Sequence, residues 1–261
     1  MKTLAAKRRH PAALFVLLLA ALLTMGTAYA FASPRTTAAP STAAAATDEE
    51  AGKAIFLANC ASCHGVLAQG GQFAPSLAGV GAASVDFQMG TGRMPMVRPG
   101  VQAPREPRLF DQQQINQVGA YIASLAPGPA VPSTEYTEGG GDAARGGEIY
   151  RVNCAMCHNA SGAGGALTRG KYAPSLRGVE GKHIYEAMLT GPQSMPVFKD
   201  TNLSPTDKKD VITFLQEVDK GENPGGYALG NIGPVPEGMF AWTFGIGLMI
   251  LAAIWLGRKA A

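Results

Sequence analysis

The sequence predicts an all-α protein in which two similar small domains lie between two membrane-type helices. An apolar segment lies near each end of the 261-residue chain, the region between them contains an internal repeat, and apolar residues recur there at helical spacing. No alternating strand pattern of useful length is present. Gly and Pro are plentiful, at 33 and 18 residues, and aromatic residues make up only 7%. Compact domains of this composition need something besides side chains to fill their interiors.

The amino-terminal segment, residues 1–32, is predicted to be a signal peptide or a signal-anchor helix. Basic residues between Lys2 and Arg9 precede the uncharged run Ala12 to Phe31, which is long enough to span a membrane. Ala28-Tyr29-Ala30 matches the A-x-A pattern of a cleavage site. Cleavage and retention therefore remain alternatives, and under both the following chain is exported.

The carboxyl-terminal apolar run, residues 239–257, is predicted to be a transmembrane helix. It contains Trp242 and Trp255 near its ends, and Arg258-Lys259 opens a short cytoplasmic tail, residues 258–261. By the positive-inside rule the basic ends lie in the cytoplasm, so the domains lie on the extracytoplasmic side of the cell (plasma) membrane.

The charge distribution excludes a nucleic-acid partner. The formal net charge is +3, but six of the 22 basic side chains lie in the two terminal segments, so the chain between them is mildly acidic. Nucleic-acid binding requires a clustered basic face. The basic ends are instead expected to flank membrane segments.

Segments rich in small and turn-forming residues divide the exported region. Residues 33–47 are predicted to form an Ala/Pro-rich tether, and residues 127–141 a linker. The domains predicted between these boundaries span residues 48–126 and 142–222, and a junction over residues 223–238 leads to the last helix.

The two domains are predicted to be repeats of one unit. Three matches occur in the same order, which indicates internal duplication. They pair residues 52–64 with 146–158 at an offset of 94, Ala-Pro-Ser-Leu at 74–77 with 173–176, and the Met-Pro elements ending at Pro95 and Pro196.

Capping signals place helices in both repeats. Thr47 to Glu50 and Asp111 to Gln114 form capping boxes, and Ser204-Pro205 supplies an N-cap followed by proline at the first helical position. Apolar stripes are predicted to face the two cores: Ile115, Val118, Ile122 and Leu125, and Val211, Phe214, Leu215 and Val218.

Each repeat contains the pattern C-x-x-C-H, and the two motifs use all four cysteines. Two thiols one helical turn apart can add to the vinyl groups of a porphyrin, while the adjacent imidazole binds the iron. A thioredoxin-like pair would need a βαβ context, and a zinc site would not explain a histidine after each pair. The sequence therefore predicts two covalently bound haem c groups, attached at Cys60, Cys63, Cys154 and Cys157, with His64 and His158 as iron ligands.

Met94 and Met195 are the predicted sixth ligands of the two irons. Each precedes a proline in the equivalent place of its repeat, 30 and 37 residues after the motif histidine. A methionine ligand closes the iron to other ligands and raises its potential. Met96, Met89 and Met188 remain rival ligands, whereas His183 has no counterpart in the first repeat and is expected at the surface or beside a haem propionate.

The sequence resembles the diheme cytochrome c subunit of the actinobacterial cytochrome bc complex, a menaquinol:cytochrome c reductase. The matching stretches are residues 87–95, 102–105, 170–174, 188–196 and, most specifically, 224–239. This resemblance implies two tandem class I cytochrome c domains. It also implies that His64 and His158 each donate a ring N–H to a proline carbonyl. Pro75 and Pro174 fit that role by order, with simple turn formation as the alternative.

The resemblance also implies an electron path and a set of partners. The Rieske iron-sulfur subunit would reduce the first haem after the cytochrome b subunit oxidises menaquinol, and the second haem would pass the electron to an aa-type terminal cytochrome c oxidase. The quinol site would lie on other subunits, so no catalytic residue is assigned here. A diheme peroxidase, which needs an open iron site, and a membrane-anchored diheme carrier of another respiratory complex remain alternatives.

Overall fold

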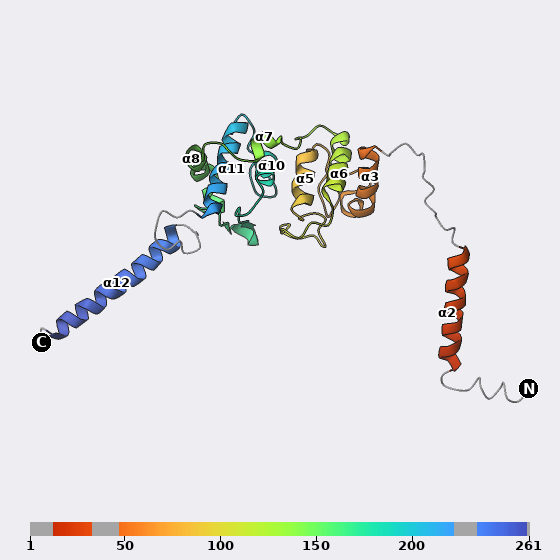
Figure 1. Ribbon diagram of the computed structural model, residues 1–261, viewed down its shortest axis with the longest axis horizontal. Coiled ribbons are helices and arrows are strands. Elements are labelled where there is room, and N and C mark those ends of the chain that lie inside the picture. Colours follow the sequence, from red (N-terminus) through yellow and green to blue (C-terminus); the bar gives the residue numbers. More distant parts are fainter. Residues whose placement is uncertain (1–12, 33–46, 222–233, 260–261) are drawn as a thin grey trace, which may run out of the picture. The chain divides into compact units, whose positions relative to one another are not determined.

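The computed structural model describes residues 13–32, 47–221 and 234–259 (Figure 1). The basic amino-terminal cluster, the predicted tether and the first part of the predicted junction lie outside the described residues. Two apolar helices correspond to the predicted end segments: α2 spans Ala13–Ala32, and α12 spans Pro234–Lys259. Helix α12 begins before the predicted start of the apolar run, because Pro234 and Glu237 are favourable residues in a first helical turn.

Helix α12 is long and apolar enough to cross a membrane. Residues Val235–Lys259 have a mean hydropathy of 2.0, and none of their apolar window is buried against the rest of the protein. Trp242 is 74% exposed and Trp255 is 58% exposed, as expected for aromatic side chains that contact lipid at the interface. The helix is therefore a membrane anchor.

The first helical domain is built from four helices. They are α3 (Asp48–Asn59), α4 (Ala61–His64), α5 (Gly81–Gly90) and α6 (Gln112–Leu125). The predicted capping boxes at Thr47 and Asp111 are both confirmed. Phe56, Ile115 and Ile122 lie at the centre of its apolar core, which shows why the expected stripe on α6 faces inward. Leu125, at 37% exposure, lies at the edge of that stripe.

The second helical domain repeats this order with additions. Its helices are α7 (Thr134–Thr137), α8 (Ala143–Asn153), α9 (Ala155–His158), the 3-10 turn η1 (Thr168–Gly170), α10 (Gly181–Thr190) and α11 (Pro205–Lys220). The predicted N-cap at Ser204 is confirmed, and Asp207 completes a capping box there. Tyr150, Ile212 and Leu215 form the centre of a second core, separate from the first.

One short hairpin departs from the all-helical expectation. Strands β1 (Gly165–Ala166) and β2 (Tyr172–Ala173) pair antiparallel. The loop after the motif histidine is longer in this domain, since the equivalent prolines Pro75 and Pro174 follow 11 and 16 residues after their histidines. The added residues form the hairpin. Two-residue strands give no periodic signal, so the sequence could not reveal them.

A glycine permits the central helix crossing in each domain. A Cβ atom on Gly52 of α3 would lie 1.9 Å from the carbonyl oxygen of Gln117 on α6, and one on Gly146 of α8 would lie 1.9 Å from that of Asp210 on α11. Only a residue without a side chain allows backbones to approach this closely. The two glycines are equivalent in the repeat, so both domains use the same crossing.

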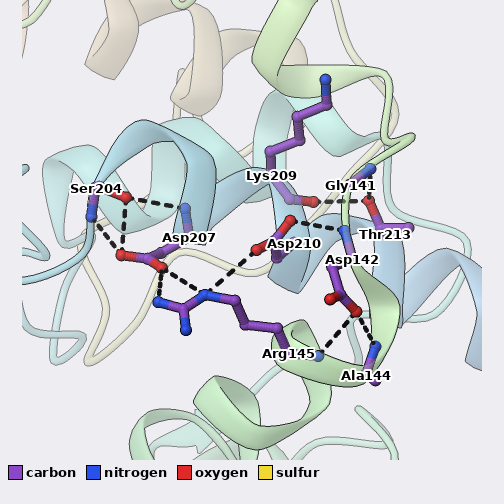
Figure 2. Close-up of polar contacts among 9 residues, drawn as sticks. All are labelled: Gly141, Asp142, Ala144, Arg145, Ser204, Asp207, Lys209, Asp210 and Thr213. Carbon is purple, nitrogen blue, oxygen red and sulfur yellow. Dashed lines mark hydrogen bonds and ion pairs between the residues drawn. The ribbon is translucent and has the colours of Figure 1, made fainter.

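Polar contacts fix the start of α8 against α11 (Figure 2). The carboxylate of Asp142 caps α8 by accepting from the backbone N–H groups of Ala144 and Arg145, and the N–H of Asp142 donates to Asp210 at 2.8 Å. Arg145 reaches back to α11, where its Nη2 atom lies 2.7 Å from Oδ1 of Asp207. This arrangement orients α8, which leads directly into the second C-x-x-C-H motif.

Candidate haem sites

Each C-x-x-C-H motif lies on a short helix that follows a longer one. Helix α3 ends at Cys60 and α4 carries the rest of the first motif, whereas α8 ends at Cys154 and α9 carries the rest of the second. The change of helix at the first cysteine turns the motif histidine inward. His64 and His158 are accordingly each only 8% exposed.

A proline carbonyl holds each motif histidine. Nδ1 of His64 lies 2.8 Å from the carbonyl oxygen of Pro75, and Nδ1 of His158 lies 3.0 Å from that of Pro174. The prolines therefore act as hydrogen-bond acceptors, which was one of the two predicted roles. Since a carbonyl can only accept, Nδ1 carries the proton and donates it. The other ring nitrogen, Nε2, is then left with a lone pair, which is the form that binds a metal.

The pKa values of two residues in the second motif favour a neutral His158 and a protonated Cys154 thiol. Burial lowers the pKa of His158, against the opposing effect of its bond to Pro174. Burial, helped by the nearby Cys157, raises the pKa of Cys154 to about 11. A redox-active C-x-x-C pair has a lowered thiol pKa, so this environment disfavours that alternative.

A large cavity in the second domain contains the whole predicted site. Its lining includes Cys154, Cys157, His158 and Met195, together with apolar side chains from α10 and α11. The predicted residues thus line one cavity, in which His158 offers a nitrogen ligand and Met195 a sulfur ligand. Such a donor set fits a haem iron with histidine and methionine as axial ligands.

The structure brings Met195 and Met188 to this cavity, although they differ in setting. Met188 is 2% exposed and belongs to the core cluster, whereas Met195 is partly buried and packs against its edge. The first domain shows the same pattern, with Met89 at 5% exposure inside the core and Met94 packed against it. Met96 is partly buried and is not part of that cluster.

A buried polar cluster joins the two domains, and sequence reasoning missed it. Asp86 of α5 and Glu186 of α10 are 2% and 0% exposed, and ligand atoms of Asp86, His183 and Glu186 lie within 4.8 Å of one another. Of the two expected positions of His183, the surface position is wrong, since the residue is 7% exposed and its Nδ1 lies 2.9 Å from Oε2 of Glu186. His183 also lines the cavity, so a position beside a haem propionate remains a prediction.

The charges of this cluster balance without a metal ion. Nζ of Lys182 lies 2.7 Å from Oδ2 of Asp86. Burial raises the pKa of Glu186 to about 10, and its hydrogen bond with Asp86 acts in the same direction. Burial also opposes ionisation of Asp86, but hydrogen bonds from Glu186, Lys182 and Gln112 outweigh it and lower the pKa. A protonated Glu186 therefore donates to an ionised Asp86 that is paired with an ammonium.

The repeat contained a signal for this cluster. Helices α5 and α10 each have ten residues, and Asp86 and Glu186 are both the sixth residue of their helix. Each is an acidic side chain surrounded by buried apolar neighbours, which is uncommon unless it has a partner. Two such positions in equivalent helices indicate a contact between the repeats.

Two helical domains, each with a C-x-x-C-H motif and a buried histidine fixed by a proline carbonyl, define a cytochrome c that binds two haem c groups. A family profile described as "Cytochrome c" matches residues 49–126, and one described as "Cytochrome C oxidase, cbb3-type, subunit III" matches residues 141–215. The chain is accordingly a diheme electron carrier with one domain per haem.

Relatives define the family more closely. The "Cytochrome bc1 complex cytochrome c subunit" of Mycobacterium tuberculosis (strain ATCC 25618 / H37Rv) is 43% identical over 94% of this chain and 90% of its own length. The protein of that name from Mycobacterium leprae (strain TN) is 44% identical over 94% and 87%, and that from Corynebacterium efficiens is 43% identical over 80% and 76%. The chain belongs to the family of cytochrome c subunits of cytochrome bc1 complexes.

Proposed function

We propose that this chain is the electron-transfer subunit of a membrane-bound menaquinol:cytochrome c reductase, and that it carries electrons from the Rieske iron-sulfur subunit through two haems to an aa-type terminal oxidase. The observation that carries this proposal is the duplicated histidine–proline contact at 2.8 and 3.0 Å, because it prepares an iron-binding imidazole in both domains of one chain. Family membership supports assembly with a cytochrome b subunit and a Rieske subunit. The quinol site is assigned to those other subunits.

The haem ligands are assigned residue by residue. Cys60 and Cys63 attach the first haem, and Cys154 and Cys157 attach the second. His64 and His158 are the proximal ligands, and Met94 and Met195 are the sixth ligands. The haem supplies one-electron redox chemistry, and a sulfur ligand raises its potential. The partial burial of Met94 and Met195 beside their cores supports this choice over Met89 and Met188, which belong to the cores themselves.

The membrane arrangement follows from the ends of the chain. Arg258 and Lys259 at the end of α12 favour a cytoplasmic carboxyl terminus, which leaves both haem domains on the extracytoplasmic side. Helix α2 is either a second anchor or the apolar part of a cleaved signal peptide. A tether and a junction, proposed over residues 33–47 and 223–238, connect the domains to these helices.

Purification in mild detergent through a carboxyl-terminal tag tests the proposal. The polypeptide should exceed its calculated mass by two haem groups under denaturing conditions and should co-purify with a cytochrome b and an iron-sulfur protein. A mass gain of one haem or none contradicts the cofactor assignment. Co-purification of the tagged chain with a quinone-independent enzyme, and without a cytochrome b, contradicts the proposed assembly with cytochrome b and Rieske subunits. The mass also shows whether the segment before residue 31 is retained.

A further inference from the structure

The first domain forms part of the wall of the second haem cavity. That cavity is lined mainly by second-domain residues, but Phe87, Thr91, Arg93, Gln102 and Arg105 of the first domain also line it. The site around His158 is therefore shared between the repeats.

Hydrogen bonds hold this part of the first domain against the second. The side-chain amide of Gln102 donates to the carbonyl oxygen of Tyr172 at 2.7 Å, and its oxygen accepts from the N–H of Tyr172 at 2.9 Å. The side chain of Gln193 donates to the carbonyl oxygen of Ala103 at 3.3 Å. These hydrogen bonds attach the segment that carries Arg105 to the hairpin on one side and to the loop before Met195 on the other.

The side chains that line the cavity carry positive charge without a carboxylate to balance it. Arg93, Arg105 and Lys171 line the cavity, and among the described residues its lining includes no Asp or Glu. Lys171 donates to Ser194 at 3.0 Å. The guanidinium of Arg93 lies over the ring of Phe87, 4.9 Å from its centroid. In the described part of the chain, neither Arg93 nor Arg105 forms an ion pair.

The two arginines are also close enough to repel each other. Burial lowers the pKa of Arg93, and the neighbouring charge of Arg105 acts in the same direction. Two like charges at the edge of one cavity are unfavourable unless an anion lies between them or beside them. A haem carries two propionate carboxylates, and arginine binds carboxylates through two parallel hydrogen bonds.

We propose that Arg93 and Arg105 of the first domain bind the propionates of the haem held by the second domain. This inference rests on the proposed haem site at His158 and assigns that site two residues from the other repeat. The potential of the second haem then depends on contact between the domains, because two positive charges near a haem favour its reduced state. The repeats are in this sense one electron-transfer unit.

Redox titration of the full chain with both haems attached tests this proposal. Arg93→Gln and Arg105→Gln should each lower the potential of the second haem, by about tenfold in the reduction equilibrium or ~59 mV for one electron. The potential of the first haem should stay unchanged. Arg93→Lys should lower the potential of the second haem much less than Arg93→Gln does, because lysine keeps the positive charge. Arg108→Gln is the matched control, since Arg108 is an exposed first-domain arginine outside the cavity lining.

The outcomes separate this proposal from the haem assignment. If denaturing mass measurement shows that no haem is attached at the second motif of the unmodified chain, the proposed function fails before the titration begins. With both haems attached, an unchanged second potential in both glutamine variants overturns the inference. A shift confined to the first haem overturns it as well, because Arg93 would then act on the haem of the adjacent Met94. Arg105→Gln carries the test if Arg93→Gln lowers haem incorporation.

Discussion

The ammonium of Lys182 on α10 lies 2.7 Å from the Asp86 carboxylate on α5, and this ion pair joins the second domain to the first. The Asp86 side chain is 3% exposed and that of Lys182 is 28% exposed. Removing one partner of a buried pair leaves an uncompensated charge. The pair therefore makes the domain interface sensitive to single substitutions.

We expect Lys182→Ala to destabilise the protein by about 3 kcal/mol, the lower end of the range for breaking a buried pair, because Lys182 keeps some contact with water. Denaturant unfolding followed by helical circular dichroism measures the change. Lys199→Ala, at an exposed lysine, is the control. Adding Asp86→Asn to Lys182→Ala should recover part of the loss. A loss in the double variant equal to the sum of the losses in Lys182→Ala and Asp86→Asn would show that the two residues are not coupled.

Glu186 makes stability depend on pH. Its pKa is raised by burial to about 10 in the folded protein, above the ordinary carboxyl value of 4.5. Between these values the folded state binds more protons than the unfolded state, so stability falls as pH rises. The groups that face Glu186 are Asp86 on α5, Lys182 and His183 on its own helix, and Glu180 at the N-cap of that helix.

Glu186→Gln should remove this dependence, since an amide stays neutral at every pH. The variant should therefore gain stability relative to the unmodified protein between about pH 6 and about pH 9, when thermal unfolding is measured across that range. A constant difference between the two proteins over the whole range would indicate that Glu186 is ionised when folded.

The crossing glycines should be intolerant of any side chain. Gly146→Ala places a methyl group 1.9 Å from the carbonyl oxygen of Asp210, so the helices must separate, and we expect a loss of about 1–3 kcal/mol or more. Gly119→Ala is the matched control on α6, because its Cβ would lie 3.5 Å from the nearest atom and alanine favours helix by about 1 kcal/mol. Unfolding curves that show equal losses for both would contradict the close-crossing explanation.

The sixth-ligand assignment predicts two separate spectral losses. Met94→Leu should remove the sulfur-to-iron absorption band of the first haem and lower that haem's potential, and Met195→Leu should do the same for the second haem alone. Visible and near-infrared spectra of the oxidised protein measure this. Met96→Leu is the control. Loss of the first band in Met96→Leu, with the band intact in Met94→Leu, would move the ligand to Met96.

The sequence predicted local features well because their signals are local. The capping boxes at Thr47 and Asp111 and the N-cap at Ser204 involve residues three positions apart and occur as expected. The histidine–proline contacts could be expected from order within the repeat, but periodicity alone did not separate an acceptor from a turn. The resemblance left both roles open, and the histidine–proline contacts in the structure supplied that distinction.

The acidic residues Asp86 and Glu186 of equivalent helices indicated that the repeats touch, but the partners in the contacts between the domains could not be predicted. These contacts join residues that lie about 70 to 100 positions apart in the sequence, as in the pairs Asp86–Lys182 and Gln102–Tyr172. Nothing in the neighbourhood of Arg93 or Arg105 indicates that they line a cavity in the other repeat. Such contacts depend on how the folded domains are arranged against each other, and local sequence patterns do not encode that arrangement.

Rapid mixing of the intact assembly with quinol tests the central claim, that electrons pass in order through both haems of this chain. With the two haems resolved by their potentials, the haem of His64 should be reduced before the haem of His158. Met195→Leu should leave the first step fast and slow oxygen consumption, because it lowers the second potential. Reduction of the His158 haem first in the unmodified protein would contradict the proposed order.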